Sequence, residues 1–280
     1  MKGIGFLLSF ILLSFSCFSQ SDTIPLPAVA TSSFSVNGVE IKMVKVERCS
    51  FWMGAQKSDT LEFNYNPYAQ PDEYPVHHVV ISKDFLIGES EVTQKLWKAV
   101  MGENPSIKCR KRRPVNNITW YEAMAFIDSL NKITHLDFRL PTEEEWEYAA
   151  RGGKYSRNHI YSGADDYKKS FWCFENSRHA KRTCRGVANE LGIYDMSGNV
   201  YEWCQTRYGY YDGERKEPAQ GKVPLYVIRG GCWSFPAKDA RVSWRGKRFA
   251  NAKAPYGGFR LCLDARHAQE QTVPEEKPKK

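Results

Sequence analysis

The sequence lacks the short motifs that identify several common enzyme classes. It has no Gly-x-Ser-x-Gly motif, on which many serine hydrolases carry their nucleophile. Its six histidines include no His-x-x-x-His pair, the spacing with which one helix face binds zinc. His77 and His78 are neighbours in an apolar stretch typical of a strand, so we interpret both as structural. The sequence therefore carries no signature of a serine hydrolase or a zinc peptidase.

Beyond its N-terminal segment the sequence also lacks an apolar run long enough to cross a bilayer. The N-terminal segment differs, because Lys2 is followed by an almost unbroken apolar run over 4–18. This pattern predicts a secretory signal peptide over 1–19, with cleavage after Ser19. Cleavage before Cys17, which would create a lipoprotein, is the alternative. We therefore expect an exported protein, in the periplasm, in the cell envelope or outside the cell, with no transmembrane span.

Composition divides the rest of the chain into three parts. Residues 20–39 are polar and contain prolines, so we interpret them as a linker. Residues 40–264 are expected to form one domain, since the whole chain, at 42% hydrophobic and 26% charged, has an ordinary globular composition. Residues 265–280 are charged and rich in proline, which predicts a disordered basic tail.

The formal net charge of +8 is concentrated in part in the basic run 108–113. Such a run is compatible with nucleic-acid binding or with a solvated loop. Because the N-terminus predicts export, we interpret the run as a solvated loop and expect no nucleic-acid partner.

The number of cysteines constrains the possible disulfides. Of eight cysteines, seven remain after removal of the segment that holds Cys17. An oxidising compartment favours disulfides, and an odd number leaves at least one cysteine outside an intramolecular pair. The sequence does not fix the pairing, although Cys173 and Cys184 are close enough to close a short loop.

Three threonines mark the expected helices. Thr93 precedes a helix ending near Gly102, and Thr119 precedes a helix over 120–132. Thr142 forms a capping box with Glu145 at the start of a third helix. Alternating or short apolar runs predict strands elsewhere, at 34–53, 76–81, 226–233, 241–245 and 258–262.

The most unusual stretch, 192–203, places Asp195 and Glu202 on either side of Gly198. Glycine permits backbone conformations that other residues avoid, so carboxylates and carbonyls can converge there. Hard cations such as calcium bind through such oxygen atoms. The alternative interpretation is a tight turn with capping acids, since the spacing is not that of a standard calcium loop.

Several separated motifs occur in an order that is characteristic of one family. They are Pro75-Val76-His77, Glu91-Val92-Thr93, Pro114-Val115-Asn116, Arg139-Leu140-Pro141-Thr142, the stretch 189–203, Arg229-Gly230-Gly231 and Gly258-Phe259-Arg260. In this order they resemble the formylglycine-generating enzyme family, also called the sulfatase-modifying factor family. The resemblance extends over residues 40–264.

The resemblance implies a fold and a metal. The expected fold is a single compact α+β domain with little regular secondary structure, distantly similar to C-type lectins. The expected metal is a structural calcium ion held by side-chain oxygens of Asp195 and Glu202 and by backbone carbonyls of Gly198 and Val200. A second calcium site of the family has only Asn176 as a counterpart here.

The resemblance also exposes a missing catalytic pair. Enzymes of this family use molecular oxygen to oxidise a cysteine in an unfolded sulfatase segment to formylglycine, and two cysteines bind their copper(I). These positions fall on Phe235 and Ala240, neither of which offers the soft thiolate that copper(I) prefers. No cysteine lies between Trp233 and Leu261 to replace them. We therefore expect neither bound copper nor formylglycine chemistry.

Two other cysteines have alternative interpretations. Cys232 lies beside the expected groove, and Cys204 directly follows the Glu-Trp pair of the central stretch. A disulfide between them would join two core segments, as export favours. Alternatively, the two form a relocated thiolate pair that binds a soft metal or does redox chemistry.

Two hypotheses of function follow. In the first, the chain is an exported, non-catalytic binding or envelope-structural module for a peptide, a glycan or an envelope protein. In the second, it is an oxygen-dependent oxidoreductase that acts on protein cysteine through Cys232.

Overall fold

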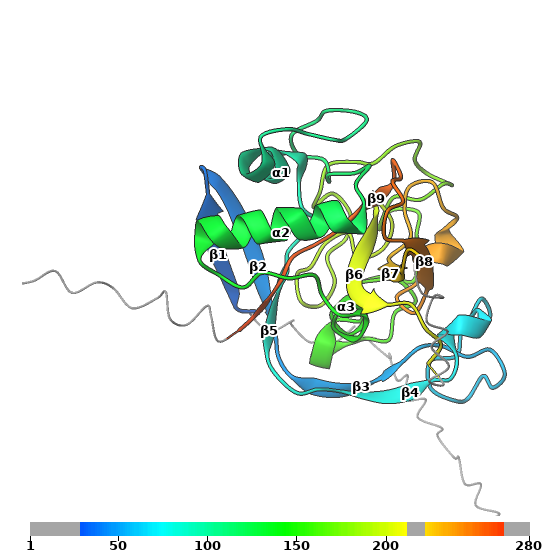
Figure 1. Cartoon of the computed structure of the whole chain (residues 1–280). Helices are drawn as coiled ribbons and strands as arrows, with labels where there is room; N and C mark the ends of the chain where they lie inside the picture. The colour runs from blue at the N-terminus through cyan, green and yellow to red at the C-terminus, as the bar shows by residue number, and fades with distance from the viewer. Residues whose placement is uncertain (1–28, 212–221, 266–280) are drawn as a thin grey trace, which may run out of the picture.

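The computed structural model describes residues 29–211 and 222–265 (Figure 1). The expected signal peptide and possible lipidation site, and the whole expected tail except Ala265, lie outside these residues. Within the described ranges, no helix has the length and apolar character that a bilayer span needs.

Three antiparallel or mixed sheets make up most of the regular structure in these ranges. The first has the order β1 (Thr31–Val36), β2 (Val39–Val46), β5 (Phe85–Gly88) and β10 (Cys262–Asp264). The second is the ribbon of β3 (Cys49–Met53) and β4 (His77–Ile81). The third has the order β8 (Arg245–Phe249), β7 (Leu225–Arg229), β6 (Tyr201–Arg207) and β9 (Gly257–Gly258). Short 3-10 helices occur at Pro71–Glu73, Gly153–Tyr155 and Ala237–Ala240.

The three predicted helices are confirmed: α1 (Gln94–Met101), α2 (Trp120–Thr134) and α3 (Glu143–Ala150). Thr93, Thr119 and Thr142 each accept a hydrogen bond from the backbone amide three residues later, which satisfies an otherwise unpaired donor. Figure 1 shows α2 running between the β1–β2 hairpin and β6. Strands therefore dominate a domain with few helices, as the expected α+β class required.

Strand β1 corrects the interpretation of residues 20–39 as a linker in its described part, since residues 20–28 lie outside the described ranges. All six of its residues pair with β2, from Thr31 opposite Val44 to Val36 opposite Val39. The turn between them is Asn37-Gly38, and both residues have positive φ, at 47° and 71°. Asn-Gly is the preferred pair for a two-residue hairpin turn, so the sequence did contain a signal for this strand.

Two further strand predictions need correction. The segment expected as a strand over 241–245 is instead a turn after the 3-10 helix, and β8 begins only at Arg245. Arg241 is buried because it pairs with Glu73, so its position reflects an ion pair and not a strand face. The segment 258–262 is divided between β9 and β10.

Three hydrophobic clusters are buried in the described residues, and β6 contributes to the two larger ones. Tyr201 and Trp203 belong to the cluster that contains most of the apolar face of α2. Cys204 belongs to the cluster around Trp146 of α3. Successive strand residues face opposite sides of a sheet, so β6 contributes to both clusters.

Candidate functional site

The segment expected to carry the catalytic pair begins where β7 ends. Gly230 and Gly231 follow the strand with φ of 84° and 62°. At Gly231 a Cβ would clash with the carbonyl group of Asp239, so the close approach of these two segments requires glycine. The turn delivers Cys232, which is fully buried, and then leads to the 3-10 helix Ala237–Ala240.

Phe235 and Ala240 occupy an apolar environment at the two copper positions. The Phe235 ring lies 5.9 Å from the ring of Trp244 and 5.5 Å from that of Tyr256, between centroids. Ala240 is 1% exposed, and its carbonyl accepts a hydrogen bond of 2.7 Å from Oγ of Ser197. Neither side chain has a sulfur, nitrogen or oxygen atom to donate to a metal. The residues present therefore do not fit copper(I).

The proposed disulfides do not form in the structure. Cys204 and Cys232 are free thiols, and so are Cys173 and Cys184. Cys204 belongs to the hydrophobic cluster around Trp146, to which Cys232 does not belong.

Neither thiol has the environment of a reactive cysteine. Burial raises the pKa of Cys232 to about 12. Burial, followed by the negative charge of Glu143, raises the pKa of Cys204 well above its ordinary value. Both remain protonated at neutral pH, and a protonated thiol is a poor nucleophile and a poor metal ligand.

The second predicted centre is the acidic stretch, in which Glu202 is already fully engaged. Its Oε1 accepts from Nη2 of Arg260 at 2.7 Å, and its Oε2 accepts from Nε of Arg260 at 2.6 Å. Nε1 of Trp146 donates to the same Oε2 at 2.7 Å. Glu202 is completely buried, so this bidentate ion pair neutralises its charge inside the protein.

Asp195 differs from Glu202 because one of its oxygens has no partner. Its Oδ2 accepts from the backbone amide of Cys184 at 2.7 Å, whereas Oδ1 is buried without a hydrogen bond. Burial raises the pKa of Asp195 to about 6. Gly198, three residues later, has φ of 74°, and a Cβ there would clash with the carbonyl of Trp172. The turn is thus tightly packed against a neighbouring segment.

Glu91 is a carboxylate at this centre that the sequence interpretation missed as a site residue. Its Oε1 accepts from Nδ2 of Asn199 at 2.8 Å, while Oε2 is buried without a partner. Burial, and then the charges of Asp195 and Glu202, raise the pKa of Glu91 well above its ordinary value. The guanidinium of Arg260 is bonded to Glu202, so Asp195 and Glu91 would carry poorly compensated negative charge when ionised, in line with their raised pKa values.

Two of these three carboxylates have an oxygen that could bind a cation. The unpaired oxygens of Asp195 and Glu91 are suitable donors for a hard cation, but Glu202 is committed to Arg260. No group of three or more histidine, cysteine, aspartate and glutamate side chains has metal-binding geometry within the described ranges. A calcium ion would therefore depend on Asp195, Glu91 and backbone carbonyls, those of Gly198 and Val200 being the predicted ones.

The predicted remnant of a second calcium site has a structural role. Oδ1 of Asn176 accepts from the amide of Cys173 at 2.9 Å, and its Nδ2 donates to the carbonyl of Phe171 at 2.8 Å. The side chain therefore fixes its own loop.

A chain of buried ion pairs connects α3 to the third sheet. Arg229 of β7 donates to Glu147 and, at 3.4 Å, to Glu143, both on α3. Arg245 of β8 binds Glu143 through Nε at 2.7 Å and Nη2 at 2.6 Å. Arg151 binds Glu147 through Nε and Nη2 at 2.9 and 2.7 Å. These pairs hold the glycine turn after β7 in place.

Comparison with known proteins gives the chain a family. Residues 32–265 match the family described as the sulfatase-modifying factor enzyme 1-like domain. The chain belongs to this family. The resemblance that the motifs suggested is thus confirmed, and the matched region begins within β1, eight residues before the expected domain start at residue 40.

Members of the family with other names are also similar to this chain. The Chaperone protein LppX of Paenibacillus barcinonensis is 33% identical over 239 residues, which cover 67% of this chain and 82% of LppX. The serine/threonine-protein kinase pkn1 of Chlamydia pneumoniae is 36% identical over 69% of this chain, but the match spans only 35% of that kinase. The structure of Treponema denticola variable protein 1 superimposes with a TM-score of 0.69 at 27% identity, covering 84% of this chain and 99% of that one. The family domain therefore occurs in proteins with different names.

Proposed function

We propose that this chain is an exported, non-catalytic member of the family, in which the fold serves as a binding or envelope-structural module. The observation that carries the proposal is the apolar character of Phe235 and Ala240. Formylglycine formation in this family needs two thiolates there, and neither residue can supply one. The match to a protein named as a chaperone is consistent with a binding role.

The burial and the raised pKa of Cys232 argue against an alternative catalytic centre at this residue. It is fully buried, its pKa is raised to about 12, and Cys204, the other candidate, is also fully buried. An oxidase that used Cys232 would need an exposed, deprotonated thiol.

A turnover assay tests this proposal. The purified protein is incubated with copper(I), oxygen and a Cys-x-Pro-x-Arg peptide, and the mass change from thiol to aldehyde is followed. We expect no aldehyde above the control without protein, while an active formylglycine-generating enzyme converts the peptide under the same conditions. Aldehyde that disappears in Cys232→Ser would refute the proposal and support the oxidoreductase hypothesis.

We also propose that calcium stabilises the acidic turn through Asp195 and Glu91. Binding would offset the charge of two buried carboxylates whose neighbouring guanidinium, that of Arg260, is bonded to Glu202. Thermal unfolding of the purified protein is measured with excess calcium and with a chelator. Calcium should raise the midpoint for the unchanged protein and have a much smaller effect on Glu91→Gln and Asp195→Asn. Equal midpoints of the unchanged protein in calcium and chelator would contradict this proposal.

A further inference from the structure

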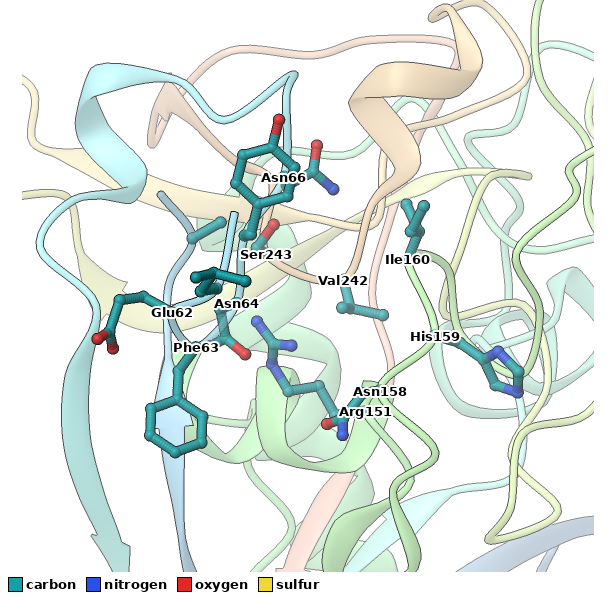
Figure 2. A pocket seen from close by; sticks show the side chains of 13 residues that line it. Glu62, Phe63, Asn64, Asn66, Arg151, Asn158, His159, Ile160, Val242 and Ser243 are labelled. Atoms are coloured by element: carbon teal, nitrogen blue, oxygen red, sulfur yellow. The ribbon is translucent and has the colours of Figure 1, made fainter. Parts of the chain in front are cut away.

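A cavity of about 320 Å³ lies on a side of the domain to which the family's catalytic positions do not contribute (Figure 2). Its walls come from the loop after β3, from the end of α3, from the loop around residue 159 and from the turn before β8. Its lining residues are Ala55, Leu61, Glu62, Phe63, Asn64, Tyr65, Asn66, Arg151, Asn158, His159, Ile160, Val242 and Ser243. The volume is at the lower end of the range for small-molecule sites, roughly 300–1,000 Å³. Cys232, Phe235 and Ala240 are not part of the lining.

One arginine of the buried ion-pair network lines this cavity. Arg151, Arg229, Arg241 and Arg245 are compensated by three carboxylates, those of Glu73, Glu143 and Glu147. Two guanidiniums share Glu147, and one of them belongs to Arg151 at the cavity wall. The network therefore has one guanidinium more than it has carboxylates, and Arg151 is the member that lines the cavity.

Arg151 has a donor that is available to a ligand. Its Nε and Nη2 bind Glu147 and the carbonyl of Gly54, but within the described part of the chain no protein atom accepts from Nη1. Its side chain is only 10% exposed, so this donor is held rigidly and partly away from water. Figure 2 shows the guanidinium directed between Asn64 and Val242, with the carboxylate of Glu62 turned away from it.

Amide groups surround this donor. Asn66 is 6% exposed, and its Oδ1 accepts from the amide of Tyr68, whereas its Nδ2 donates to no atom of the described residues. The side-chain amide of Asn158 likewise has no hydrogen bond to the described part of the protein. Asn64 uses its Nδ2 for the carbonyls of Trp52 and Gly54, which leaves its Oδ1 as an acceptor. Donors and acceptors are thus mixed around one cationic group.

Exposed aromatic rings border the same cavity. Phe63 is 61% exposed and stacks on Trp52, with ring centroids 5.4 Å apart and planes inclined by 11°. Tyr65 is 40% exposed. A large exposed aromatic side chain beside a cavity is typical of a ligand site. Flat rings of this kind pack against the C–H face of a pyranose, while amides bind its hydroxyl groups.

We propose that this cavity binds a hexuronate residue of an acidic saccharide. The carboxylate of the sugar accepts from Nη1 of Arg151, its hydroxyl groups bind the amides of Asn66 and Asn158, and its ring packs on Phe63. A neutral sugar would leave the excess charge of Arg151 without a partner, and a simple anion would leave the amides and the aromatic ring unused. This inference supplies a ligand class for the binding role proposed above and rests on it.

Titration calorimetry with the purified protein tests the inference. The probes are digalacturonate, a glucuronate-containing disaccharide and the uncharged α-1,4-digalactose. We expect at least one uronate to bind, and to bind about tenfold more tightly than the neutral disaccharide, because a charge-assisted hydrogen bond is lost with the latter. Added salt should weaken uronate binding. A lack of binding by both uronates, or equal binding of the neutral sugar, would overturn the inference.

Variants of the lining residues test the location of the site. Phe63→Ala and Asn158→Ala change exposed side chains and should each weaken uronate binding by about fivefold to tenfold. Phe249→Ala is the matched control, since this aromatic residue is 54% exposed but does not line the cavity. Arg151→Lys should weaken binding by at least about tenfold, with circular dichroism used to check that the protein is folded.

Two controls separate this inference from its alternatives. A tripeptide with a free C-terminal carboxylate that bound as tightly as the uronates would overturn the assignment to a saccharide. The turnover assay described above is independent of this cavity, so the non-catalytic proposal and the ligand assignment can fail separately.

Discussion

Glu147 is the carboxylate on which the buried ion pairs depend most. It is completely buried and binds Arg151, Arg229 and the backbone amide of Gly54. Burial alone would raise its pKa, but the charges of Arg151 and Arg229 and the hydrogen bond from Gly54 lower it below the ordinary value of 4.5. Glu147 is therefore charged in the folded protein, and its charge contributes to stability.

We predict that Glu147→Gln lowers the free energy of unfolding by about 3–5 kcal/mol, because it leaves buried guanidiniums uncompensated. The folded-state pKa of Glu147 lies below that of the unfolded chain. Its contribution is therefore fully present above pH 4.5 and is lost as the pH falls through the folded-state value. Urea unfolding at neutral pH and in acid measures both effects. The exposed Glu103→Gln is the control, and a loss of less than about 1 kcal/mol in Glu147→Gln would contradict the prediction.

Gly198 and Gly192 form a matched pair, with which the backbone cost of a side chain at positive φ can be measured apart from the cost of a steric clash. Both have positive φ, at 74° and 76°, but a Cβ clashes with Trp172 at Gly198 and meets nothing within 4 Å at Gly192. Gly192→Ala should lower the free energy of unfolding by about 1 kcal/mol, the conformational penalty alone. Gly198→Ala should lower it by more than about 2 kcal/mol, because the clash is added. Equal losses by thermal unfolding would show that the turn can move away from Trp172.

At the scale of elements, the helices were predictable and the long-range contacts were not. Capping threonines act within three residues, so Thr93, Thr119 and Thr142 correctly mark all three helix starts. Glu202 pairs with Arg260, 58 residues later, and Glu91 accepts from Asn199, 108 residues later, so no local pattern reveals either contact. Likewise, both cysteines of the predicted pair Cys204 and Cys232 are free in the structure, and the sequence does not show that Cys204 packs in a cluster without Cys232.

The capping box of α3 permits a prediction about a single element. Oγ1 of Thr142 accepts from the amide of Glu145 at 3.2 Å, and the Glu145 side chain accepts from the amide of Thr142 at 2.9 Å. Thr142→Ala should lower the free energy of unfolding by about 1 kcal/mol, since one amide loses its partner. Thr142→Ser keeps the hydroxyl group and should lose less. If urea unfolding gave both variants the same stability, the hydroxyl group would not be the stabilising feature.

At the scale of the whole molecule, the domain begins earlier than its composition indicated. Val36 is 2% exposed within the first cluster, and the Phe34 ring packs edge-on against Phe138 at 5.6 Å between centroids. A chain that starts at residue 40 should therefore unfold several degrees below one that starts at residue 29, because it loses β1 and exposes the edge of β2. Thermal unfolding of the two chains measures this. The control is a chain that ends at residue 265, whose unfolding midpoint should equal that of the chain with its C-terminus intact. Equal midpoints for the chains that start at residues 29 and 40 would contradict the role of β1.

The alternation of arginine and glutamate between α3 and the third sheet also has a consequence for evolution. Glu143 and Glu147 each serve two arginines, so neither carboxylate can be replaced alone without leaving buried guanidiniums uncompensated. Each lineage should therefore inherit or discard these residues as a set. Phe235 and Ala240 at the copper positions take part in no ion pair within the described residues: Phe235 packs on aromatic rings, and the Ala240 carbonyl accepts from the Ser197 hydroxyl group. Descent with modification can therefore remove the chemistry of the family one residue at a time, while the scaffold resists piecemeal change.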